Sequence, residues 1–187
     1  MRFPGYPPPG RGAREPWLGM VVGVQRTTEN SIGSMVVEWE GGDLSWADFR
    51  GKVLGPTDPA EAPADSLRGR IMHSWKGLGL KAEPNVGDNG VHASASPFES
   101  LAERMNWLGQ GLDSLPFGHA LLEMGVPEEA IKDWTVDPQV LYSDGTKGSL
   151  FDRLEDLDAP VCLERCATLA SNNRKRPGDD DADADAD

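Results

Sequence analysis

A helix-start signal at Ser96 is the feature of this sequence that most constrains the fold. Ser96 and Glu99 stand three residues apart, which is the spacing of a capping box, and Pro97 occupies the preferred first position of a helix. Apolar residues then recur at helical spacing and define one face: Phe98, Leu101, Ala102, Met105 and Leu108. The pattern predicts an amphipathic helix that begins at residue 97.

Two apolar segments near the N-terminus predict strands. The segment WLGMVVGV (residues 17–24) is short and apolar, and GSMVVEWEGG (residues 33–42) has aliphatic side chains from Met35 to Val37 and a Gly-Gly stop. Short runs of this kind, bounded by glycine, are typical of strands. We therefore expect one strand in each segment.

Capping signals predict two further short helices before residue 90. The segment DLSWADFRGKVLG has Asp43 or Ser45 as its cap and ends at Gly55. A loop rich in proline follows, because proline disrupts regular pairing, and Ser66 can cap one or two helical turns after it. Repeated glycines then indicate a second loop over residues 76–90.

The sequence after residue 110 predicts a series of short helices. Four segments fit a helix: SLPFGHALLEMG, which Gly125 closes, PEEAIKDW, SLFDRLEDL and VCLERCATLA. Cys162 and Cys166 stand four residues apart in the last of these, a spacing that fits neither a redox pair nor a zinc site. We expect reduced thiols in a helical core, because free cysteine is among the most buried residue types.

Composition limits the core and the partners. The 187 residues are 38% hydrophobic and include 22 Gly and 15 Pro, which suits one core with an appended lobe and many loops. The formal net charge is −13, which argues against nucleic-acid binding. No apolar run reaches the ~18 residues of a membrane span, and the N-terminus has charge and proline where a secretory signal is apolar. We expect a cytoplasmic protein with neither nucleic acid nor a membrane as its partner.

His92 is notable for the small residues around it. In NGVHASAS the histidine lies between Gly90 and two alanines, Ala93 and Ala95, which leave space beside the imidazole. A neutral imidazole is a nucleophile, and a phosphate needs room to approach it. Taken alone, the same residues are also typical of a small-residue turn that enters a capped helix.

Four separated segments resemble the nucleoside diphosphate kinase family. NGVHASAS resembles the family's active-site signature Asn-x-x-His-Gly-Ser-Asp-Ser, and MVVEWEGG resembles the strand that enters the active-site half. VLGPTDPAEAPADSLRG resembles the family segment Leu-Gly-x-Thr-Asn-Pro…Pro-Gly-Thr-Ile-Arg-Gly, with Thr57 and Arg68 eleven residues apart, as in the family. Glu103 follows His92 by eleven residues, again the family spacing. The resemblance covers roughly residues 34–110.

This resemblance implies a phosphotransferase that moves the γ-phosphoryl group of ATP to a nucleoside diphosphate through a phosphohistidine. His92 would be the nucleophile, Glu103 would fix the tautomer of its ring, and Ser94 would support that carboxylate or the phosphoryl oxygens. The family's phosphate- and nucleotide-binding positions correspond to Thr57, Arg68 and Asn89. Mg²⁺ would be carried by the nucleotide phosphates. Family members are usually hexamers, so the resemblance also implies a homo-oligomer.

The fold class implied by the resemblance is α+β, as a partial ferredoxin-like fold of the nucleoside diphosphate kinase type with a C-terminal helical extension. Residues 1–16 would be a disordered Pro/Gly-rich leader and residues 17–110 the kinase-like domain, incomplete in its N-terminal half. Residues 111–171 would be the helical extension, and residues 172–187 a disordered acidic tail.

The chain departs from the family pattern at several positions. A further family arginine, three residues before Leu-Gly, is Gly51 here, flanked by Arg50 and Lys52, either of which could substitute after a one-residue shift. Ala93 and Ala95 replace the Gly and Asp of the signature, and the family's Lys-Pro-Asp motif has no counterpart. Loss of one electrostatic donor typically costs on the order of 10²–10³ in rate. The alternative function is therefore a catalytically impaired nucleotide-binding or scaffold module, and a third interpretation is a piece of a complete enzyme.

Overall fold

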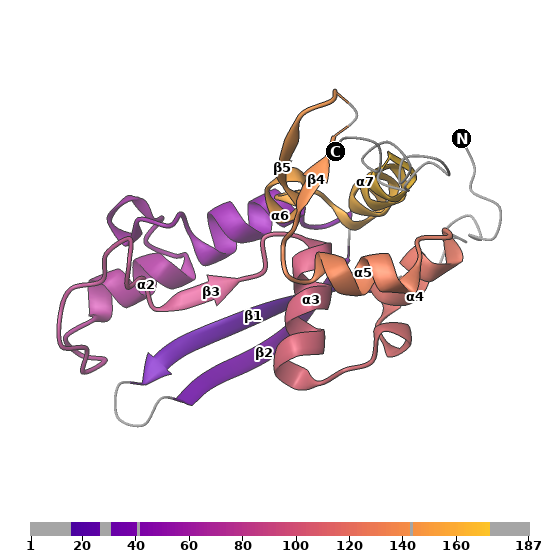
Figure 1. Cartoon of the computed structure of the whole chain (residues 1–187). Coiled ribbons are helices and arrows are strands. Elements are labelled where there is room, and N and C mark those ends of the chain that lie inside the picture. Colours follow the sequence, from indigo (N-terminus) through magenta and orange to yellow (C-terminus); the bar gives the residue numbers. More distant parts are fainter. Residues whose placement is uncertain (1–15, 27–30, 41, 143, 173–187) are drawn as a thin grey trace, which may run out of the picture.

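Three antiparallel strands form the main sheet of this α+β fold, which is shown as a computed structural model in Figure 1. The structure describes residues 16–26, 31–40, 42–142 and 144–172. Within them, β1 (Pro16–Arg26) lies between β2 (Ser31–Glu40) and β3 (Val91–Ala93). Both strands predicted near the N-terminus are confirmed.

The register of the sheet places β3 at one edge and β2 at the other. β1 pairs with β2 from Pro16 opposite Glu40 to Arg26 opposite Ser31. On its other side β1 pairs with β3, where Val22 lies opposite His92. Because β2 and β3 are both antiparallel to β1, they run parallel to each other, and the chain between them crosses from one edge of the sheet to the other.

The segment after β2 forms the short helix that the sequence predicts. α1 (Trp46–Asp48) continues directly into the π-helical turn η1 (Phe49–Leu54). Of the two candidate caps, Ser45 is the one used, because its Oγ accepts a hydrogen bond from the Asp48 N–H at 3.1 Å. Gly55 ends the segment at φ 95°, a conformation that favours glycine.

A second capped helix follows the proline-rich loop. The loop contains one 3-10 turn, η2 (Pro59–Glu61), and leads into α2 (Leu67–Ser74). Ser66 caps α2 as predicted, since its Oγ accepts from the Gly69 N–H at 3.1 Å. Residues 76–90 are a loop, also as predicted.

The helix predicted from the capping box is α3 (Pro97–Leu108), which lies across the sheet (Figure 1). Ser96 Oγ accepts a hydrogen bond from the Glu99 N–H at 3.1 Å, and the Glu99 carboxylate accepts one from the backbone N–H of Ala95. Leu108 is 39% exposed, so the buried apolar face ends one turn earlier than the sequence predicts.

A lobe of short helices with one hairpin completes the described chain. Its elements are η3 (Leu112–Ser114), α4 (Pro116–Glu123), α5 (Glu128–Trp134), β4 (Gln139–Leu141), β5 (Lys147–Ser149), α6 (Leu150–Leu154) and α7 (Ala159–Asn172). The helices correspond to the predicted segments. The antiparallel hairpin of β4 and β5 was not predicted, and the expectation of helices alone is wrong there.

Side chains support the hairpin in addition to its short backbone ladder. The Asp137 carboxylate accepts hydrogen bonds from the Phe151 N–H at 2.8 Å and from the Ser149 hydroxyl at 2.7 Å. The Tyr142 hydroxyl donates to the Ser149 carbonyl oxygen at 2.6 Å. Strands of three residues carry almost no periodic signal, which is why the sequence pattern does not reveal them.

One apolar core joins α3 to the C-terminal lobe. Phe98 and Leu101 of α3 belong to the same buried cluster as side chains from α4 to α7, among them Leu121, Ile131, Leu150, Leu154, Cys162 and Cys166. The boundary expected between residues 110 and 111 therefore crosses a shared core. Both cysteines are free and fully buried, which confirms the expected thiols in a helical core.

The expected leader and acidic tail fall almost wholly outside the described residues. β1 begins at Pro16 and α7 ends at Asn172, and the rest of the expected leader and tail lies outside the described residues. Among the described helices, none has the length and apolar character needed to cross a lipid bilayer.

Candidate functional site

Strand alternation in β3 presents His92 away from the small core of the sheet. Val91 and Ala93 are 7% and 4% exposed and pack with Phe49 and Leu54 on one face. Successive side chains of a strand point to opposite faces. His92 therefore projects from the other face, and its side chain is 52% exposed.

A carboxylate from α3 holds the ring of His92. Nε2 of His92 lies 2.6 Å from Oε1 of Glu103, whose side chain is 14% exposed. The other carboxylate oxygen, Oε2, accepts a hydrogen bond from the Ser94 hydroxyl at 2.5 Å. Three residues assigned to catalysis by resemblance thus lie in one chain of contacts, from ring to carboxylate to hydroxyl.

The electrostatic environment favours a proton on His92. The hydrogen bond to Glu103 is the main cause that raises the pKa of His92, and burial opposes it. The negative charges of Glu103 and Glu99 also raise this pKa. When the ring is neutral, donation to Glu103 keeps the proton on Nε2. Nδ1 then carries the lone pair, and it has no hydrogen-bond partner among the described residues.

Arg68 lies beneath the same strand. Its Nη2 donates to the carbonyl oxygen of Val91 at 2.9 Å, directly before His92, and its Nη1 donates to that of Gly55 at 2.8 Å. Arg68 is 8% exposed, and its buried Nε atom has no hydrogen-bond partner among the described residues. Arg68 therefore lies next to His92, as the family spacing predicts. Both of its Nη groups, however, donate to backbone oxygens.

Thr57 and Asn89 meet each other in the loops beside the sheet. Nδ2 of Asn89 donates to the carbonyl oxygen of Thr57 at 3.3 Å, across 32 residues of sequence. Neither residue is hydrogen-bonded to His92 within the described chain. The two predicted nucleotide contacts are thus neighbours at the rim, separate from the contacts of the ring.

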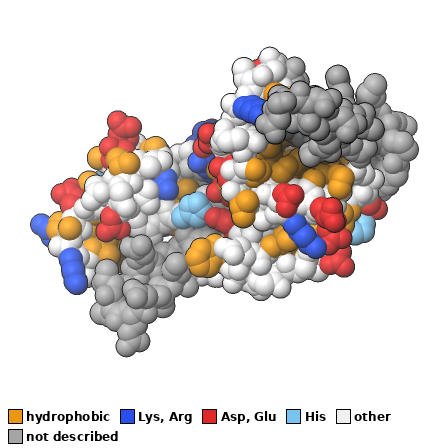
Figure 2. Space-filling view, in the orientation of Figure 1, with side chains coloured by type: hydrophobic (Ala, Val, Ile, Leu, Met, Phe, Trp, Pro, Cys, Tyr) orange, Lys and Arg blue, Asp and Glu red, His pale blue; other side chains and the backbone are white. Residues whose placement is uncertain are grey.

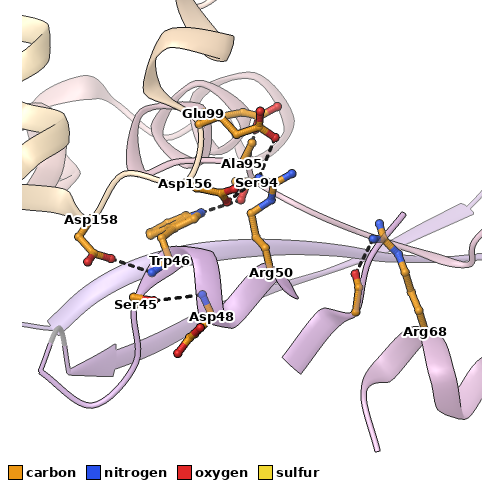
Figure 3. A network of polar contacts seen from close by, with 12 residues as sticks. Ser45, Trp46, Asp48, Arg50, Arg68, Ser94, Ala95, Glu99, Asp156 and Asp158 are labelled. Carbon is orange, nitrogen blue, oxygen red and sulfur yellow. Dashed lines mark hydrogen bonds and ion pairs between the residues drawn. The ribbon is translucent and has the colours of Figure 1, made fainter. Parts of the chain in front are cut away.

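The two cations proposed as replacements for the family arginine differ in their surroundings. Nη1 of Arg50 lies 2.8 Å from Glu155 and 2.6 Å from Asp156. Lys52 is 73% exposed and pairs with Asp48 of the preceding turn at 2.9 Å. Burial lowers the pKa of Arg68, and the positive charge of Arg50 acts in the same direction. Figure 3 shows Arg50 beside Ala95 and Glu99, so of the two cations Arg50 is shown next to the site.

Glu99, which the sequence predicts only as part of the capping box, is also a residue of the site. It lies one turn before Glu103 on the same face of α3, and ligand atoms of His92, Glu99 and Glu103 lie within 4.8 Å of one another. The four-residue spacing of the two glutamates was the available signal. Burial raises the pKa of Glu99, with the charge of Glu103 acting in the same direction.

These three side chains are a plausible set of ligands for some metals and a poor one for others. One imidazole and two carboxylates suit Zn²⁺, whereas Mg²⁺ prefers an octahedron of oxygen atoms and keeps several waters. Their positions are already explained by hydrogen bonds to one another, to Ser94 and to Ala95. The set therefore gives no support to a protein-bound Mg²⁺, and the Mg²⁺ expected with the nucleotide phosphates stays a prediction.

A second polar network, also unforeseen from sequence, joins the site to the C-terminal lobe (Figure 3). The buried indole of Trp46 donates from Nε1 to the Ser94 carbonyl oxygen at 2.9 Å. Asp158 accepts from the Trp46 N–H at 2.7 Å, and the Asp156 N–H donates to the Ala95 carbonyl oxygen at 2.9 Å. Figure 2 shows histidine, acidic and basic side chains gathered near the middle of one face of the molecule.

Comparisons with known proteins found no significant match for this chain. No protein-family model matches the chain, and neither a curated protein nor a solved structure matches it significantly.

Proposed function

We propose that the chain is a phosphotransferase similar to the nucleoside diphosphate kinases, in which His92 carries the γ-phosphoryl group of ATP to a nucleoside diphosphate. The observation that supports this most is the arrangement of ring, carboxylate and hydroxyl, with Nε2 of His92 2.6 Å from Glu103 and Glu103 bonded to Ser94. This arrangement fixes the tautomer whose Nδ1 lone pair is available on a half-exposed ring.

The reaction consists of two displacements at phosphorus. Nδ1 of His92 forms a bond to the γ-phosphorus while the bond to the bridging oxygen breaks, and ADP leaves with the electron pair. A terminal oxygen of the nucleoside diphosphate then attacks the same phosphorus, the nitrogen–phosphorus bond breaks, and the ring is neutral again. The proton on Nε2 stays with the hydrogen bond to Glu103, whose negative charge stabilises the positive charge of the phosphorylated ring. Mg²⁺ on the nucleotide would supply further charge neutralisation.

The topology of the sheet supports a fold of the ferredoxin-like type. β2 and β3 run parallel to each other with β1 between them, and α1, η1 and α2 lie in the connection. This is the split βαβ arrangement of which ferredoxin-like folds contain two. The chain would then carry one split unit, with α3 after its last strand.

A catalytically impaired nucleotide-binding or scaffold module is the second candidate. The observation that favours it is that both arginines already have partners within the protein. Arg68 donates to two backbone oxygens, and Arg50 is paired with two carboxylates. Phosphoryl transfer needs donors that point at the transferred group. A chain with both arginines engaged elsewhere would bind nucleotide with little turnover.

Incubation with ATP labelled at the γ-phosphate distinguishes the two. The phosphotransferase should acquire label that is stable in base, labile in acid and lost on addition of a nucleoside diphosphate, and His92→Ala should lose it entirely. His119→Ala is the matched control, because His119 is an exposed histidine on α4 whose side chain lies near Glu123. Nucleotide binding without label would establish the second candidate, and label that persists in His92→Ala would overturn the role of His92.

A further inference from the structure

The connection between α6 and α7 contacts the candidate site at three separate points. The backbone N–H of Asp156 donates to the Ala95 carbonyl oxygen at 2.9 Å. The Asp158 carboxylate accepts from the Trp46 N–H at 2.7 Å, and the carboxylates of Glu155 and Asp156 both lie against Nη1 of Arg50. Figure 3 shows Asp156 and Arg50 pointing toward each other beside Ala95 and Glu99.

The contact with Arg50 resembles the contact that a phosphate would make. Two carboxylates present several negatively charged oxygens to one guanidinium, and the same planar donor group binds phosphate oxygens. Arg50 lies on η1, directly beside the position of the family arginine that Gly51 replaces. The carboxylates of Glu155 and Asp156 therefore pair with a cation whose chemistry also suits phosphate oxygens.

We propose that Glu155 and Asp156 form an intramolecular latch that competes with nucleotide phosphates for Arg50, so that the C-terminal lobe limits phosphate binding at the His92 site. This proposal rests on the proposed function of that site. The side chain of Arg50 is 25% exposed and those of its two partners are each 47% exposed, so solvent reaches the ion pairs and weakens them. A polyphosphate with several charges can therefore displace the carboxylates.

The backbone around the latch explains how release of Arg50 can occur without loss of the fold. Asp156 adopts φ 58°, in the left-handed region, and its bond to Ala95 is made by its backbone N–H and not by its side chain. Asparagine tolerates this conformation as well as aspartate does. Substitution of Glu155 and Asp156 by the corresponding amides thus removes two charges and keeps both the turn and its backbone hydrogen bond.

Binding of inorganic tripolyphosphate, measured by calorimetry on the full chain, tests the latch without any need for catalysis. The variant E155Q/D156N should bind tripolyphosphate roughly 5- to 10-fold more tightly than the wild type, since a freed guanidinium can form charge-assisted hydrogen bonds. The matched control is E128Q/E129Q, which removes the same charge from the exposed start of α5 and should change the affinity less than about twofold, because distant exposed charges are screened.

A double-mutant cycle assigns the effect to Arg50. In the background of Arg50→Met, E155Q/D156N should no longer increase affinity, because there is no guanidinium left to release. Equal binding by E155Q/D156N and E128Q/E129Q would overturn the latch, and so would an increase that survives Arg50→Met. The single variant E155Q, which leaves Asp156 intact, gives the same readout with a smaller increase if the double variant proves unstable.

The result is distinguishable from the test of the proposed function. The change in tripolyphosphate affinity caused by E155Q/D156N reports on the release of Arg50, and label on His92 reports on phosphoryl transfer. If E155Q/D156N binds tripolyphosphate more tightly but the chain acquires no label, the latch stands and the kinase assignment is refuted. If His92 acquires label but E155Q/D156N does not change the affinity for tripolyphosphate, the kinase assignment stands and the latch is refuted.

Discussion

The guanidinium of Arg68 donates to the carbonyl oxygen of Val91 at 2.9 Å, so a helix that follows the proline-rich loop supports the strand residue directly before His92. The second Nη group reaches Gly55, which ends η1. One buried cation thus fixes the position of β3 relative to the loop that carries Thr57. Arg68 supports the site through the backbone in the structure as it stands.

Removal of this guanidinium should destabilise the fold as well as the site. Arg68→Met leaves two carbonyl oxygens without their partner in a buried environment, and we expect a loss of about 2–4 kcal/mol in the free energy of unfolding. Urea titration checks this. Arg70→Met is the control, because Arg70 is exposed on α2 and its Nε donates to the carbonyl oxygen of Asp65, which lies at the surface. This variant should cost less than about 0.5 kcal/mol. Equal effects of the two variants would contradict the supporting role of Arg68.

The pKa of His92 should depend on the charge of Glu103. The wild-type ring titrates above its ordinary value because Glu103 accepts from Nε2, and Glu103→Gln keeps a hydrogen-bond acceptor while it removes the charge. We expect the pKa of His92 to fall in this variant. Histidine resonances followed by NMR over a pH titration measure the shift, and His119 serves as an internal reference. A pKa of His92 that is unchanged in Glu103→Gln would contradict the contact.

The same shift predicts how stability depends on pH. A histidine whose pKa is higher in the folded state than in the unfolded state stabilises the fold most below the unfolded value, which is about 6.5. That contribution disappears as the pH rises through the folded-state pKa of His92. The difference in unfolding free energy between wild type and Glu103→Gln should therefore be larger at acidic pH than at alkaline pH. A difference that increases with pH would contradict this linkage.

Local features of the fold follow from the sequence because they depend on residues three or four positions apart. Ser45, Ser66 and Ser96 each accept a hydrogen bond from an N–H in the first turn of the following helix, and each was a candidate cap on sequence grounds. The contact of His92 with Glu103 was expected from the family resemblance, and it forms because α3 packs on β1, the strand that pairs with β3. A capping signal is complete within the segment that it starts.

Contacts between distant segments could not be predicted in the same way. Arg50 meets Glu155 across 105 residues, and the Trp46 N–H meets Asp158 across 112 residues, so neither pair leaves a pattern in a single sequence. The role of Arg68 was half predicted, because family spacing indicated its place near the histidine but not that backbone oxygens would accept from both Nη groups. Such choices depend on the packed fold as a whole.

Substitution by alanine should have opposite effects on stability at two glycines in helical segments. A Cβ atom on Gly69 of α2 would lie 1.9 Å from the Pro63 carbonyl oxygen, and the loop backbone would have to move. We expect Gly69→Ala to cost about 1–3 kcal/mol. Gly51 of η1 has open space around it, so Gly51→Ala should be neutral or stabilise by about 0.5–1 kcal/mol. Thermal unfolding of both variants checks the pair, and a stable Gly69→Ala would show that the loop is not packed against α2.

The thiols of Cys162 and Cys166 should be protected by the core that α7 shares with α3. Both side chains are fully buried, and burial together with the neighbouring Cys162 raises the pKa of Cys166 well above its ordinary value. A thiol reagent that attacks the thiolate should therefore label the native chain only as fast as the core opens. Val161→Cys provides the control, since Val161 lies on the same helix but is 47% exposed, and its thiol should react at once. Rapid labelling of the native cysteines in a folded chain would mean that α7 does not pack as the shared core requires.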